Sequence, residues 1–83
     1  MKLPRNLSGE DLVKALKNLG YQTTRQAGSH VRLTTQQMGE HHVTIPNHSF
    51  LRIGTLSSIL SSVAEHFKIS RSEIFEKIFG RIK

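Results

Sequence analysis

The tripeptide Gly28-Ser29-His30 is the part of this chain best suited to chemistry. Glycine and serine favour a tight turn, and His30 begins the short alternating segment that follows. An imidazole exchanges protons near neutral pH, and the backbone N–H groups of Gly28 and Ser29 can approach a phosphate oxygen closely. These are properties that RNA cleavage requires. The alternative is that His30 is an ordinary polar residue on an exposed sheet face.

The chain is small and basic, with 83 residues, 12 Lys and Arg against 6 Asp and Glu, and a net charge of +6. Such a surplus favours a nucleic-acid partner, because Lys and Arg release counterions from phosphates. The length fits one domain, 1–83, with a modest core. The absence of cysteine excludes disulfides and thiol nucleophiles. No apolar run reaches transmembrane length and no signal-peptide core is visible, so we expect a cytoplasmic protein with no membrane partner.

Three helices are predicted from capping signals and apolar spacing. Ser8 and Asp11 form a start signal, and the apolar face that follows ends at Gly20. A second helix follows Gly54, and a third begins with the Ser70 and Glu73 capping box. The apolar positions of the three helices are Leu12, Val13, Leu16 and Leu19; Leu56, Ile59, Leu60, Val63 and Phe67; and Ile74, Phe75, Ile78, Phe79 and Ile82. We interpret the third helix as packing that extends a small core.

Three short strands are predicted between the first two helices, at residues 22–26, 30–34 and 42–45. In the second strand, Val31 and Leu33 should face the core, while His30, Arg32 and Thr34 face solvent. The third strand stops at Pro46, which cannot donate to a central ladder. The order α-β-β-β-α-α favours an α+β fold, with helices on one face of an antiparallel three-stranded sheet and the other face wet.

The loop between the second and third strands predicts which histidine lies near His30. A hairpin closing symmetrically around Met38 places His30 opposite Pro46 and His42 opposite Thr34. His42 then lies roughly 13 Å from His30, at about 3.3 Å per residue. His48, just past Pro46, is therefore the candidate for a second acid or a phosphate ligand. The alternative is that His48 only caps or packs the connector.

The five histidines do not predict a metal site. His41 and His42 should project to opposite faces, and no carboxylate is expected at ligand spacing from a histidine. We therefore expect neither a metal nor a cofactor. Phosphate contacts are expected instead from basic residues and from the start of the second helix, whose free N–H groups favour anions. These candidates are Lys2, Arg5, Arg25, Arg32, Arg52 and Thr55.

Five segments together resemble the HicA (YcfA-like) family of toxin–antitoxin mRNA interferases. They are Leu3-Pro4-Arg5, Leu19-Gly20-Tyr21, Gly28-Ser29-His30, Ile45-Pro46-Asn47-His48 and Gly54-Thr55-Leu56. The resemblance extends from residue 1 to about residue 75. This chain has Ile53 where the family commonly has a basic residue, and its C-terminal segment is longer than the family's short tail.

The resemblance implies a double-stranded-RNA-binding-domain-like fold and His30 as the catalytic residue of an endoribonuclease. It also implies mRNA as the substrate and a HicB-like antitoxin as the protein partner. Two other interpretations stay open. One is a module that binds double-stranded RNA without cutting it. The other is an antitoxin-like or DNA-binding regulator, although no helix-turn-helix spacing stands out.

Overall fold

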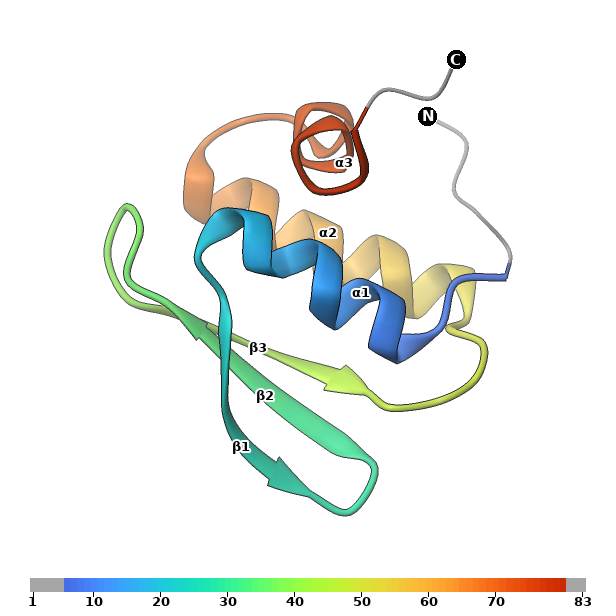
Figure 1. The fold of residues 1–83 in the computed structure, drawn as a ribbon. Helices are drawn as coiled ribbons and strands as arrows, with labels where there is room; N and C mark the ends of the chain where they lie inside the picture. The colour runs from blue at the N-terminus through green and yellow to red at the C-terminus, as the bar shows by residue number, and fades with distance from the viewer. Residues whose placement is uncertain (1–5, 81–83) are drawn as a thin grey trace.

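The computed structural model describes residues 6–80 and has helices packed on one face of an antiparallel sheet (Figure 1). The elements are α1 (Gly9–Leu16), the 3-10 turn η1 (Lys17–Leu19), β1 (Gln22–Ala27), β2 (His30–Thr35), β3 (His41–Pro46), α2 (Ile53–Phe67) and α3 (Arg71–Phe79). The predicted α+β class and element order are therefore confirmed. Within the described residues, no helix is long and apolar enough to span a bilayer.

Capping boxes start α1 and α3, as the sequence predicts. The Ser8 hydroxyl accepts a hydrogen bond from the Asp11 N–H at 3.0 Å, and the Ser8 N–H donates to the Asp11 carboxylate at 3.2 Å. Ser70 and Glu73 repeat this arrangement. Gly20 ends the first helical segment with φ of 80°, a left-handed conformation that glycine adopts without a Cβ clash. The last turn before Gly20 is 3-10 rather than α-helical.

The strands follow the order β1-β2-β3 and are one or two residues longer than predicted. The predicted hairpin register is confirmed, because His30 pairs with Pro46 and Thr34 pairs with His42. The register of β1 against β2 shifts between Thr23 and Arg25, which places a bulge in an edge strand. The sequence gives no signal for this bulge.

The core lies between the sheet and the helices. Val31 and Leu33 are buried on the helix side of β2, as predicted, while His30 and Arg32 are exposed on the other side. Thr34 is half-buried rather than exposed, and its hydroxyl lies 2.9 Å from that of Thr24 and 2.7 Å from the His42 Nδ1. The residues that fill the core from the helices and their connections include Leu12, Leu16, Leu19, Tyr21, Leu51, Leu56, Leu60, Val63, Ile74 and Ile78.

The two C-terminal helices complete this layer. The second helix begins at Ile53, so it includes Gly54 rather than following it. Ile74 and Ile78 of α3 are buried in the core, and the rings of Phe75 and Phe79 lie 4.8 Å apart against it. The third helix is therefore part of the packing, as the apolar spacing indicates. Ile82, which the sequence assigns to the same helix, lies outside the described residues.

Candidate functional site

The turn before β2 fixes the position of His30. Gly28 and Ser29 alone separate Ala27 from His30, which are paired residues of β1 and β2. Gly28 has φ of 58°, the left-handed value required at the first central position of a type II′ hairpin turn. Gly28 thus adopts the backbone conformation that the turn requires, and His30 follows as the first residue of β2. Gly28, Ser29 and His30 are all exposed to solvent.

His30 lies on the sheet face away from the helices, here called the open face. Its cross-strand neighbours are Ala27 and Pro46, and the next row holds Arg25, Arg32 and Thr44. Directly paired residues share a face, so Arg25 and Arg32 both project from the open face, one row from His30. The structure thus adds Arg25 to the surface on which the sequence placed His30 and Arg32.

The Arg25–Arg32 pair is unfavourable for the fold by itself. Like charges directly opposite each other on neighbouring strands repel. Within residues 6–80, neither arginine forms an ion pair, since the ion pairs there are Lys14–Glu10 and His42–Glu40. An anion bound on the open face would relieve this repulsion.

A connector, residues 47–52, joins β3 to α2 and is attached to the turn and to α1 by backbone hydrogen bonds. The Asn47 N–H donates to the Ser29 carbonyl at 2.6 Å, and the Gly9 N–H donates to the His48 carbonyl at 2.9 Å. Gly9 is packed so tightly that a Cβ there would lie 2.1 Å from the Pro46 carbonyl oxygen. His48 is exposed, and it is the backbone of His48, not its imidazole, that holds the connector to α1.

The remaining predicted phosphate contacts lie further along the chain. Arg52 is exposed and precedes α2 without forming a side-chain cap, and Thr55 is half-buried in the first turn of that helix. Figure 1 shows the connector running from the end of β3 towards the start of α2, away from the β1–β2 turn. Lys2 and Arg5 lie outside the described residues. The structure therefore brings His30 together with Arg25 and Arg32 more directly than with Arg52 and Thr55.

His42 corrects one expectation from the sequence. The His42 Nε2 lies 2.7 Å from the Glu40 Oε2, and its Nδ1 lies 2.7 Å from the Thr34 hydroxyl oxygen. The expectation that no carboxylate lies at ligand spacing from a histidine is wrong for this pair. Glu40 and His42 are two residues apart at the start of a strand, so their side chains reach the same face. Among the described residues, no group of three or more His, Cys, Asp or Glu side chains is arranged to hold a metal ion.

A second set of polar contacts lies on the helix side of the sheet, where the sequence analysis assigned no function. The Tyr21 hydroxyl lies 2.7 Å from the His41 Nδ1, and the Ser62 hydroxyl lies 3.2 Å from the His41 Nε2. Burial lowers the pKa of His41 below its ordinary value of 6.5, and His66 and His42 lower it further. Strand alternation predicts that His41 faces the helices, because it shares the parity of the core residues Val43 and Ile45, but it does not predict the contacts with Tyr21 and Ser62.

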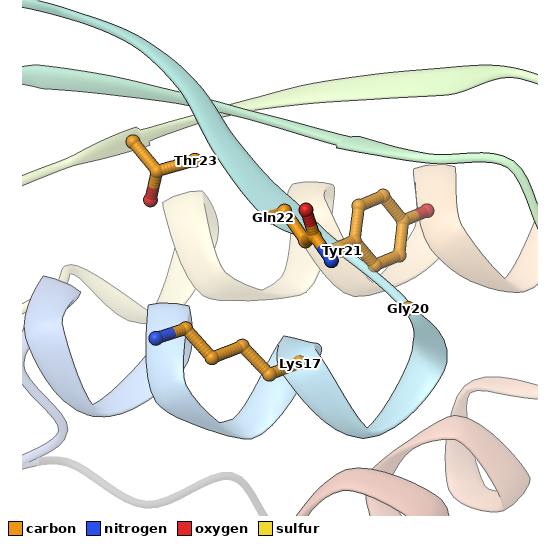
Figure 2. Close-up of a pocket in the computed structure, with 5 residues that line it drawn as sticks. All are labelled: Lys17, Gly20, Tyr21, Gln22 and Thr23. Carbon is orange, nitrogen blue, oxygen red and sulfur yellow. The ribbon is translucent and has the colours of Figure 1, made fainter.

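The described clefts do not coincide with His30. Figure 2 shows one of about 390 Å³ lined by Lys17, Gly20, Tyr21, Gln22 and Thr23, with the Tyr21 hydroxyl pointing away from the Lys17 ammonium. This cleft lies at the start of β1, whereas the Gly28-Ser29 turn lies at its end. His30 is instead on an open surface, which suits a long polymer better than a small molecule enclosed in a pocket.

Comparison with known proteins adds a family to this geometry. The family described as "HicA toxin of bacterial toxin-antitoxin" matches residues 9–64, a range that contains the turn, His30, the connector and most of α2. No curated protein and no solved structure matches the chain. The double-stranded-RNA-binding-domain-like order of helices and strands is consistent with the fold of that family. Because the match covers more than half of the 83 residues, this chain belongs to the HicA family of bacterial toxins.

Proposed function

We propose that this protein is an endoribonuclease that cleaves mRNA in the cytoplasm, with His30 as a general acid or base. The observation that carries the proposal is the position of His30, exposed beside a Gly-Ser turn and one row from Arg25 and Arg32. An imidazole next to two cations without ion-pair partners among residues 6–80 fits a phosphodiester substrate. Membership of a toxin family supports the same conclusion.

The proposed reaction uses the 2′-hydroxyl of the RNA as the nucleophile. This oxygen attacks the adjacent phosphorus and loses its proton to a base, while the bond from phosphorus to the 5′-oxygen breaks and that oxygen takes up a proton. The products are a 2′,3′-cyclic phosphate and a 5′-hydroxyl. His30 performs one of the two proton transfers. The N–H groups of Gly28 and Ser29, together with Arg32, stabilise the charge that develops on the phosphorane oxygens.

His48 is our candidate for the second proton transfer. Backbone bonds of Asn47 and His48 hold the connector against the turn and α1, which leaves the His48 imidazole exposed near the end of the strand that pairs with His30. A side chain that is not needed for packing is available to a substrate. No metal or cofactor is required in this scheme, because the attacking oxygen belongs to the RNA itself.

We further propose that a HicB-like antitoxin inhibits the protein by covering His30. A toxin family implies an antitoxin partner. The partner should present acidic residues to Arg25, Arg32 and Arg52, so its association rate should fall as the salt concentration rises. A complex that leaves both the open face and the Gly28-Ser29 turn exposed would contradict this part of the proposal.

The test of the function is cleavage of a long RNA by purified protein, followed by end-group analysis. Wild-type protein should produce 5′-hydroxyl ends, and His30→Ala should not, while circular dichroism shows that it remains folded. His42→Ala is the matched control, since His42 lies on the same face but roughly 13 Å away at about 3.3 Å per residue. Equal cleavage by wild type and His30→Ala would remove His30 from the mechanism. RNA binding without any cleavage would favour a binding module instead.

A further inference from the structure

Four side chains from separate parts of the chain meet at the end of the sheet opposite the His30 turn. Tyr21 precedes β1, His41 begins β3, and Ser62 and His66 lie on α2. The rings of His41 and His66 are stacked, with centroids 4.4 Å apart and planes 11° from parallel. The His66 Nε2 lies 2.9 Å from the Gln37 carbonyl oxygen in the β2–β3 loop. We call Tyr21, His41, Ser62 and His66 the histidine cluster.

The contacts determine where the protons of His41 lie. Tyr21 is fully buried, and burial raises the pKa of Tyr21 to about 12, so its hydroxyl keeps its proton. Among the described contacts of that hydroxyl, the acceptor is the His41 Nδ1. His41 is therefore neutral, with its proton on Nε2, where it donates to the Ser62 hydroxyl oxygen. This tautomer has no free nitrogen to accept a proton from Ser62, which excludes a serine nucleophile activated by His41.

Protonation of His41 conflicts with this arrangement. A proton on Nδ1 would point at the phenolic oxygen of Tyr21, so the tyrosine would have to turn its own proton into apolar surroundings. His66 responds differently, because a carbonyl oxygen only accepts and the bond to Gln37 survives when His66 is protonated. Two imidazolium rings at the stacked separation repel each other. The cluster is thus compatible with at most one charged ring.

We propose that the histidine cluster is a pH-sensitive latch, which holds the β2–β3 loop and the start of β1 against the C-terminal half of α2. When both rings become protonated, they separate, and either His41 leaves Tyr21 or His66 leaves Gln37. Loss of the His66–Gln37 contact frees the β2–β3 loop from α2, whereas loss of the His41–Tyr21 contact frees the start of β1 from β3. The core that holds α1 and α3 contains Tyr21 but neither His41 nor His66, so we expect these helices to remain folded while the loop opens. The latch does not depend on the proposed cleavage of RNA.

The direction of the pH effect follows from the groups around His41. Burial, His66 on α2 and His42 on β3 all disfavour the charged form of His41. Glu65 on α2 favours the charged form, but its effect is smaller than theirs. The pKa of His41 is therefore below its ordinary 6.5 in the folded protein. Between that lowered value and 6.5, the unfolded chain binds more protons than the folded chain, so stability falls as pH falls through this interval. The latch is closed above pH 6.5 and opens in acid.

The test combines imidazole NMR with hydrogen exchange at pH 7 and at a pH below the measured His41 midpoint, using the whole chain. Ring nitrogen shifts should show His41 as the Nε2–H tautomer at neutral pH, with a titration midpoint below 6.5. Below that midpoint, the Gly39 N–H, which bonds to Gln36 at 3.2 Å, should exchange at least ten-fold faster than at pH 7 after correction for the intrinsic rate. Amides within α1 should keep their protection. Loss of protection in the loop and in α1 together would overturn the latch.

Tyr21→Phe removes the phenolic donor while keeping a ring in the core, and His48→Gln is the matched control at the other end of the sheet. In Tyr21→Phe, the His41 midpoint should move up towards 6.5, because Nδ1 no longer has to stay unprotonated. In His48→Gln, the titration midpoint of His41 should be the same as in wild type. The same His41 midpoint in wild type and Tyr21→Phe would contradict the proposal. Should Tyr21→Phe fail to fold, the tautomer and loop exchange of the wild type decide the question alone.

Discussion

His30 and Pro46 are register partners at the last position of the β2–β3 ladder. β3 is an edge strand, so the missing N–H of Pro46 removes no hydrogen bond to β2. The next residue, Asn47, bonds to Ser29 at 2.6 Å, immediately before His30. This bond fixes the start of the connector, so His48 leaves the sheet close to the strand end that carries His30.

His48→Ala should reduce the rate of RNA cleavage by about 10²-fold to 10⁴-fold, the usual contribution of one general acid or base. Because the fold uses the His48 carbonyl rather than its imidazole, thermal stability should be unchanged. The pH dependence of kcat/KM should be bell-shaped for wild type and lose one limb in His48→Ala. Retention of both limbs would assign His48 to phosphate binding or to the connector alone.

Arg25→Gln should weaken RNA binding and stabilise the fold. The substitution removes a like-charge contact with Arg32, a cross-strand interaction of roughly 0.2–1 kcal/mol. It also removes one of the proposed phosphate contacts, so the salt dependence of binding should decrease by about one unit of log–log slope. Urea unfolding and binding to a short RNA at several salt concentrations measure the two effects.

Lys77→Gln on α3 is the control for this charge change, because Lys77 is exposed on the helical layer rather than on the open face. Lys77→Gln should change the net charge by the same amount as Arg25→Gln but leave the salt dependence of RNA binding nearly unchanged. Equal effects of the two substitutions would mean that the protein binds RNA by its overall charge, not by the open face.

Gly9→Ala should destabilise the protein, although alanine is the better helix former. A Cβ at position 9 would lie 2.1 Å from the backbone oxygen of Pro46, so α1 or the end of β3 must move. Overpacking of this kind typically costs about 1–3 kcal/mol. Gly54→Ala is the opposite case, since a Cβ there meets nothing within 4 Å, and the helix should gain up to about 1 kcal/mol. Equilibrium unfolding of both variants checks the difference in sign.

Much of the site could be predicted because local rules control it. The hairpin register follows from a loop centred on Met38 and from alternation in two strands, so the sequence alone placed His30 opposite Pro46. The glycine of a type II′ turn placed His30 at the start of a strand. These features depend on neighbours within one hairpin, where sequence patterns are most informative.

The histidine cluster could not be predicted in the same way. Tyr21 and His41 come from the starts of two different strands, and Ser62 reaches His41 from α2, 21 residues further along the chain. No short-range sequence pattern predicts these contacts. The bulge in β1 likewise contains no glycine or proline that would predict it, and it shifts Arg25 into register with Arg32. The positions of charges on the open face therefore required the structure.

Cleavage should be unaffected by EDTA and abolished by a 2′-O-methyl group at the scissile nucleotide. A two-metal mechanism needs acidic ligands that converge on one site. The carboxylate nearest to a histidine is that of Glu40, and it pairs with His42, which is four positions along the sheet from the row of His30. His30 and the arginines suffice when the attacking oxygen belongs to the RNA, and methylation removes that nucleophile. The measurement is gel analysis of methylated and unmethylated oligonucleotides with and without EDTA. Cleavage of the methylated RNA, or products bearing a 5′-phosphate, would overturn this mechanism and leave the family assignment intact.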